Sequence, residues 1–177
     1  MSIIAHIRNS NTWADRASRQ AGFTLIELMI IVTLMGIFAM IAVPSFTQFI
    51  ANNRTQSLNN ETVALLQFAR STAVERRTLI KVCPGEEKWS VKEDCLASTK
   101  ALRTMELPAG STIDISANEL TFRYNGTGTA ANLFICRGGD AANGYSIEVK
   151  SSGSSRSWGR GKTGPGDEDN MTTCTNG

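Results

Sequence analysis

Glu27 is the one charged side chain in an otherwise apolar run of the sequence, from Phe23 to Pro44. An ionised carboxylate is costly inside a membrane span, and where one occurs it usually pairs with another charge or serves a functional path. The run contains no second ionisable side chain, so a partner for Glu27 must come from outside it. Glu27 is therefore the residue whose chemistry most needs an explanation.

Four cysteines form a second chemically active set, and all of them follow the apolar run: Cys83, Cys95, Cys136 and Cys174. None of them has the C-x-x-C spacing that is typical of a metal site. An even number of cysteines in an oxidising compartment favours disulfide bonds. Of the three possible pairings, 83–95 with 136–174 closes two loops that do not overlap, and it is the pairing that we expect.

Other residues with catalytic potential lack the context that an enzyme needs. The single histidine, His6, precedes the apolar run. The motif "GRGKTG" (159–164) has Arg156 where a phosphate-binding loop needs its first glycine, and Pro165 prevents a following helix. The acidic stretch 166–170 lacks the ligand spacing of an EF-hand. We therefore predict a protein that is not an enzyme and that has no cofactor and no metal site.

The apolar run is long enough to cross a bilayer. Residues 23–43 would form about 32 Å of helix, close to the thickness of a hydrocarbon core. The formal net charge of +2 arises within residues 1–22, which hold three arginines and one aspartate. The positive-inside rule then puts residues 1–22 in the cytoplasm and the chain beyond Pro44 outside. A secretory signal peptide has a shorter apolar stretch and a small-x-small exit, so we predict that this segment is retained.

Helical spacing continues beyond Pro44, which should kink the helix without ending it. Apolar positions recur three and four residues apart: Phe46, Phe49, Ile50, Leu58, Thr62, Leu65, Ala69 and Ala73. This period predicts one helix as far as residue 77, with an apolar first half and an amphipathic second half.

From residue 78 the period changes to two. The alternating segments are short and rich in β-branched residues: 78–83, 111–116, 119–125, 132–136 and 145–150. Turn residues between them predict an antiparallel sheet whose apolar face can cover the helix. Residues 151–170 should form an exposed loop, and the disulfide bond of Cys174 should restrain it. The expected fold class is α+β, with a long N-terminal helix packed on an antiparallel sheet.

The start of the apolar run resembles the processing and assembly signature of type IV pilins and pseudopilins. A basic leader, then Gly22-Phe23-Thr24-Leu25-Ile26-Glu27, then an unbroken apolar stretch make up this pattern. Residues 52–77 are similar to the minor pilins called FimT and FimU and to minor pseudopilin H of type II secretion. The resemblance extends over nearly the whole chain and is stronger up to Cys83 than after it. The leader, residues 1–22, is long for this class.

The resemblance implies a type IV pilin-like organisation in four regions. These are a cleaved cytoplasmic leader (1–22), a transmembrane and fibre-core half-helix (23–43), an amphipathic half-helix (44–77) and a periplasmic β-sheet domain (78–177). It also implies that a prepilin peptidase cuts after Gly22 and that the new amine on Phe23 is methylated. The subunit would be stored in the inner membrane and then enter the pilus fibre. Its partners would be this peptidase, the major pilin, other minor pilins and the inner-membrane assembly platform.

Cleavage after Gly22 would create a charge that Glu27 can pair with. The amine at Phe23 lies four residues before Glu27, near the same helix face. In lipid each of the two charges needs a partner, because an unpaired charge there costs several kcal/mol. The resemblance implies that Glu27 meets the amine of a neighbouring subunit. Pairing within one chain would satisfy both charges but would recruit no other subunit.

Three functions remain open at this point. The first is a FimU-like minor pilin that helps to start type IV pilus assembly and sits at or near the tip, in support of twitching motility. The second is a FimT-like pilin that binds double-stranded DNA for natural transformation through a Gly-Arg-x-Arg element near its C-terminus. The third is a type II secretion minor pseudopilin H.

The DNA-binding alternative depends on a cluster of cations and one aromatic side chain: Arg156, Trp158, Arg160 and Lys162. Such side chains suit phosphate and base contacts. The two candidate elements, 153–156 and 159–162, each differ from the Gly-Arg-x-Arg pattern at one position. Three carboxylates at 167–169 follow closely and would weaken the positive field.

Overall fold

The computed structural model describes residues 22–176, so most of the predicted leader, including His6, lies outside the described residues. Within that range the chain forms one helix, α1 (Leu25–Arg76), and eight strands. The strands are β1 (Ile80–Cys83), β2 (Lys88–Lys92), β3 (Arg103–Glu106), β4 (Ser111–Ile115), β5 (Leu120–Phe122), β6 (Ala131–Arg137), β7 (Tyr145–Val149) and β8 (Ser155–Ser157). The chain divides into two compact units between Ala42 and Val43.

The first unit holds the apolar beginning of α1. Every described residue in it is exposed, and its most apolar window has a mean hydropathy of 2.6 with none of that window buried. Among the described residues, α1 is the one helix whose length and composition would let it cross a membrane. Within residues 22–176, the apolar half-helix therefore has no protein partner.

The second unit is built around the rest of α1, which continues through Pro44 as the sequence predicted. Its buried residues recur at helical spacing: Thr55, Leu58, Asn59, Thr62, Leu65, Leu66, Ala69, Thr72 and Ala73. The predicted apolar stripe is thus confirmed from Leu58 onward. Phe46 and Phe49 do not join the core, since they are 64% and 61% exposed.

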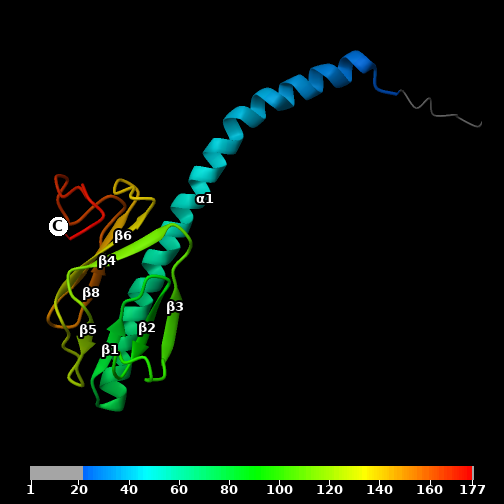
Figure 1. Ribbon diagram of the computed structural model, residues 1–177. Coiled ribbons are helices and arrows are strands. Elements are labelled where there is room, and N and C mark those ends of the chain that lie inside the picture. The colour runs from blue at the N-terminus through cyan, green and yellow to red at the C-terminus, as the bar shows by residue number, and fades with distance from the viewer. Residues whose placement is uncertain (1–21, 177) are drawn as a thin grey trace, which may run out of the picture. The chain divides into compact units, whose positions relative to one another are not determined.

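Two antiparallel sheets lie along this part of α1 (Figure 1). The first has the strand order β3-β2-β1-β5, and the second has the order β4-β6-β7-β8. One hydrophobic core joins the helix stripe to the inner faces of both sheets, through side chains such as Val82 on β1 and Ile135 on β6. The predicted α+β class is confirmed. The antiparallel strands, however, form two sheets where the sequence suggested one.

The sequence analysis missed three strands for different reasons. β2 does alternate, with Trp89 and Val91 buried, but only these two residues are apolar, and a lysine stands at each end of the strand. β3 buries only Met105. β8 has no apolar side chain and lies in residues 151–170, which we expected to be loop throughout. It is a strand because its backbone pairs with β7, with Ser155 opposite Val149.

The cysteines pair as predicted, Cys83 with Cys95 and Cys136 with Cys174. The second bond ties the C-terminal segment to β6. Next to it, the backbone and side-chain amides of Asn176 donate hydrogen bonds of 2.7 and 2.8 Å to the Asp114 carboxylate on β4. The end of the described chain is therefore held to two neighbouring strands.

Lys81 on β1 holds the first disulfide loop and β5 together. Its ammonium lies 2.9 Å from a carboxylate oxygen of Glu119 and 3.1 Å from one of Asp94. Asp94 also accepts a 2.8 Å hydrogen bond from the backbone amide of Cys95. Hydrogen bonds to Glu119 and then to Asp94 raise the pKa of Lys81, and the hydrogen bond from Lys81 lowers the pKa of Asp94.

The two disulfides should differ in their contribution to stability. Replacing Cys136 and Cys174 with serine opens a loop with a sequence separation of 38, against 12 for Cys83 and Cys95. In the chain-entropy account the longer loop contributes about 4 kcal/mol and the shorter about 3 kcal/mol. Denaturant unfolding of both double variants, in detergent and followed by circular dichroism, measures the difference. A larger loss for the shorter loop would contradict this account.

The Lys81 ion pairs should stabilise the fold at neutral pH and lose this effect at both extremes. Because folding lowers the pKa of Asp94, its contribution disappears as the pH falls through the folded value, below the ordinary 3.8. Because folding raises the pKa of Lys81, its contribution disappears as the pH rises through the folded value, above 10.5.

Lys81→Met should therefore lower the free energy of unfolding at pH 7, and the loss should vanish at strongly acidic pH. Lys92→Met is the matched control, because Lys92 pairs with Lys81 in the β1–β2 register but forms no ion pair among the described residues. Unfolding curves across pH measure both effects. A loss that is the same at every pH would mean that the lysine stem, not its charge, stabilises the fold.

Candidate functional site

The predicted processing residues lie at the exposed start of α1. Gly22 and Phe23 precede the helix, and Phe23 is 77% exposed. No described atom lies within 4 Å of the position that a Cβ on Gly22 would take. The fold itself therefore does not require glycine at this position, so a requirement for it would come from a molecule that acts on the chain.

Thr24 is the cap of the helix, a role that the sequence analysis did not assign. Its side-chain oxygen accepts a 3.2 Å hydrogen bond from the backbone amide of Glu27, and its carbonyl accepts one of 3.1 Å from Leu28. The Thr-x-x-Glu spacing of a capping box, visible in the sequence, could have identified this cap. A carboxylate in the first turn also interacts favourably with the positive end of the helix dipole.

The Glu27 carboxylate itself has no hydrogen-bond or ion-pair partner among residues 22–176. The side chains around it, such as Ile26 and Ile30, are apolar and exposed. If a second molecule packs on this apolar surface, a cation on that molecule can donate hydrogen bonds to the carboxylate. The site therefore holds a carboxylate whose cationic partner is not among the described residues.

The described contacts of the C-terminal cations join only two of the predicted residues to each other. On β8, the Arg156 guanidinium lies 4.2 Å from the centre of a Trp158 ring, so these two residues do come together. Arg156 pairs in register with Glu148 of β7, however, which puts a carboxylate beside it. The Lys162 ammonium donates a 2.7 Å hydrogen bond to the carbonyl of Asp167. No described contact joins Arg160 to the pair, and a DNA contact here stays a prediction.

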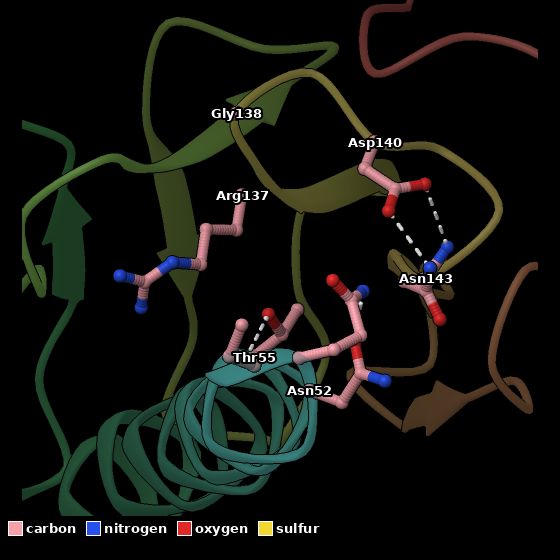
Figure 2. Close-up of a pocket in the computed structure, with 8 residues that line it drawn as sticks. Asn52, Thr55, Arg137, Gly138, Asp140 and Asn143 are labelled. Atoms are coloured by element: carbon pink, nitrogen blue, oxygen red, sulfur yellow. Dashed lines mark hydrogen bonds between the residues drawn. The ribbon is translucent and has the colours of Figure 1, made fainter. Parts of the chain in front are cut away.

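A pocket of about 230 Å³ lies between α1 and the chain that follows β6 (Figure 2). Its lining is mainly polar: Gln48, Ala51, Asn52, Thr55, Arg137, Gly138, Asp140 and Asn143. The Asp140 carboxylate accepts hydrogen bonds from the backbone and side chain of Asn143, at 3.2 and 2.7 Å. The Arg137 side chain turns away from this pair in Figure 2.

Known protein families match both the apolar start of the chain and the folded unit that follows it. The family model of the type II transport protein GspH matches residues 59–153, and the prokaryotic N-terminal methylation motif matches residues 17–43. A fimbrial protein of Pseudomonas aeruginosa is 39% identical over 73 residues, which is 41% of this chain and 47% of that protein. The type IV major alpha-pilin of Moraxella bovis is 33% identical over 112 residues, or 62% of this chain and 65% of that one. The chain thus matches less than two thirds of the length of either relative.

Two solved structures share the fold. The type IV minor pilin FimU of Pseudomonas aeruginosa is 28% identical with a TM-score of 0.52, over 61% of this chain and 90% of that one. The minor pseudopilin EpsH of the Vibrio cholerae type 2 secretion system has a TM-score of 0.51 over 59% and 96% of the two chains. At 13% identity EpsH supports the fold alone.

The two family matches fall on different parts of the chain, one on the apolar start of α1 and the other on the folded unit that follows. The methylation motif contains Gly22, Phe23 and Glu27 at the exposed start of the helix. The GspH match begins at Asn59, on the buried stripe, and runs through β7 over more than half of the chain. The chain therefore belongs to the GspH family of type IV minor pilins and pseudopilins.

Proposed function

We propose that this protein is a minor pilin that helps to initiate type IV pilus assembly and sits at or near the tip of the fibre. The observation that carries this proposal is the similarity of its folded unit to the minor pilin FimU, at 28% identity over 90% of that chain. The role is structural, since pilins and pseudopilins act by assembling with other subunits. Its partners are the major pilin, other minor pilins and the inner-membrane assembly platform.

The proposed path begins in the inner membrane, with the apolar half of α1 as a single span. Its mean hydropathy of 2.6 and complete exposure fit lipid as its first surroundings. The leader lies in the cytoplasm, where a prepilin peptidase cuts after Gly22 and the amine of Phe23 becomes methylated. Residues 78–177 lie in the periplasm, an oxidising compartment that suits two disulfides.

Glu27 makes entry into the fibre favourable. Cleavage leaves a cationic amine at the positive end of the α1 dipole, an unfavourable position for a cation. The carboxylate of Glu27 has no partner in its own described chain, and a free charge in an apolar environment is costly. When two subunits pack their apolar half-helices together, the Glu27 of one meets the amine of the next. Assembly thereby removes a cost that each subunit has while stored in the membrane.

Glu27→Ala should leave the subunit stored in the membrane and reduce its entry into the fibre. The variant should fold and insert normally, because the side chain contacts nothing in the core, but it should be depleted from the fibre at least about tenfold, or about 1.4 kcal/mol. Glu61→Ala is the matched control, an exposed acid on the same helix beyond the apolar half. Immunoblots of membrane and sheared-pilus fractions measure the ratio. Incorporation of Glu27→Ala at the level of Glu61→Ala would contradict the proposed pairing.

The alternative role, a minor pseudopilin of type II secretion, is favoured by the name of the matching family model. Deletion of the gene separates the two roles. We expect loss of surface pili and of twitching, with secretion of folded exoproteins unchanged, and recovery on expression of the intact chain. Loss of exoprotein release with normal piliation would assign the protein to type II secretion instead.

A further inference from the structure

The turn between β5 and β6 is attached to α1 by one arginine. The Arg70 guanidinium donates a 3.0 Å hydrogen bond from Nε to the carbonyl of Gly126 and one of 3.3 Å from Nη2 to the carbonyl of Ser152. Gly126 has a φ of 80°, which favours glycine. Gly153 of the neighbouring turn packs directly against the Gly126 carbonyl. A single exposed side chain thus joins two turns to the helix.

The side chain of the residue before Gly126 is held by the residue that follows Gly126. Asn125 is exposed, and its side-chain oxygen accepts hydrogen bonds from the Thr127 backbone amide at 3.1 Å and from the Thr127 hydroxyl at 2.7 Å. These bonds fold the side-chain amide of Asn125 back over the peptide of Gly126. Two donors at this distance also match the geometry that stabilises an oxyanion.

We propose that Asn125 is a site of spontaneous deamidation, which the fold promotes by means of Thr127 and Arg70. Hydroxide removes the proton of the Gly126 amide, and that nitrogen forms a bond to Cγ of Asn125. The oxygen on Cγ becomes the oxyanion that the two Thr127 groups stabilise. The bond from Cγ to the side-chain nitrogen then breaks, and ammonia leaves with a proton from water. Water opens the resulting cyclic imide to aspartate or isoaspartate.

Arg70 assists this chemistry and is also the main cover of the reacting backbone. Its Nε and Nη2 lie 3.6 Å from the position of a Cβ on Gly126, so its positive charge favours the deprotonated amide. The Gly126 amide donates a 2.9 Å hydrogen bond to the Arg123 carbonyl, and this bond must open before attack. This bond lies within a surface turn and does not involve the Arg70 side chain, and such local openings require little free energy.

The chain contains a matched site that should not react. Asn143 also precedes a glycine, but its side-chain nitrogen donates to Asp140, whose carboxylate opposes formation of nearby negative charge. Gly144 is enclosed by Met171, Ile135 and the Cys136 sulfur, with contacts of 2.7 to 3.0 Å from a Cβ position. The Cys136–Cys174 bond restrains this enclosure. Gly126 is also buried, but its neighbours are the side chains of Arg70 and Val74 at 3.6 Å, so opening there disturbs fewer close contacts.

Reaction at Asn125 would alter the joint with α1. Aspartate would put a carboxylate close to Arg70. Isoaspartate would route the backbone through an additional methylene and shift the Gly126 carbonyl away from the Arg70 guanidinium. In both products the β5–β6 turn carries one more negative charge than the newly made protein.

Peptide mass spectrometry of the full chain in detergent, incubated at pH 8, tests the proposal. Asn125 should deamidate at least about tenfold faster than Asn143 in the folded protein, and isoaspartate should be detected at residue 125. In guanidinium with the disulfides reduced, the two sites should react at similar rates. Equal rates at the two sites in the folded protein would overturn the proposal.

Thr127→Val tests whether the Thr127 hydrogen bonds speed deamidation, or whether Asn125 reacts only because it is exposed. It removes the hydroxyl donor and keeps the backbone amide, so deamidation at Asn125 should slow by about tenfold in the folded protein. The rate at Asn143, and both rates in the unfolded chain, should stay unchanged. An unchanged or faster rate at Asn125 would show that the Thr127 hydrogen bonds do not promote the reaction.

Discussion

One helix of this protein must satisfy two different environments, and the rest of the structure follows from that constraint. The second half of α1 supplies the stripe on which both sheets pack, with Leu65, Ala69 and Ala73 fully buried. The first half supplies apolar surface with one charged residue, Glu27, and no described residue covers it. Residues 22–176 thus bury one half of the helix and leave the apolar surface of the other half uncovered. This division fits the membrane anchoring of type IV pilins.

The boundary between the two environments is visible in the residues that separate them. Residues 51–57, "ANNRTQS", are mostly polar, and the buried stripe begins within them at Thr55. Phe46 and Phe49 lie before this boundary and stay exposed, although they have the helical spacing of the stripe. Periodicity alone therefore identifies an apolar helix face but not which kind of surface will cover it.

Much of the fold could be predicted because the signals are local. Helical spacing identified α1, alternation identified β1, β6 and β7, and the choice of loops that do not overlap gave the two disulfides. β8 could not be predicted, because three polar residues become a strand only through pairing with β7. The division into two sheets depends on pairings between distant strands, such as β1 with β5, that no local pattern encodes.

The candidate sites also differ in whether a local sequence pattern could identify them. A short motif predicted the roles of Gly22, Phe23 and Glu27, and these roles stay predictions. The same motif contains the Thr24 cap, which the structure shows. The attachment of two turns by Arg70 was not predictable, since its partners are backbone carbonyls 56 and 82 residues away. The C-terminal cations are close in sequence, but their neighbours in space could not be predicted. Arg156 pairs in register with Glu148, and Lys162 donates to the Asp167 carbonyl.

The central claim is that the Glu27 carboxylate is paired with the N-terminal amine of another subunit. An apolar carbodiimide, which joins a carboxylate to an amine in direct contact, tests it on intact pili and on membranes that store the subunit. In pili, the account predicts an amide bond between the Glu27 peptide and the N-terminal peptide of a different pilin, and it predicts no such product in membranes from cells that cannot assemble pili. A bond only between Glu27 and Phe23 of the same chain, equally abundant in both samples, would contradict it.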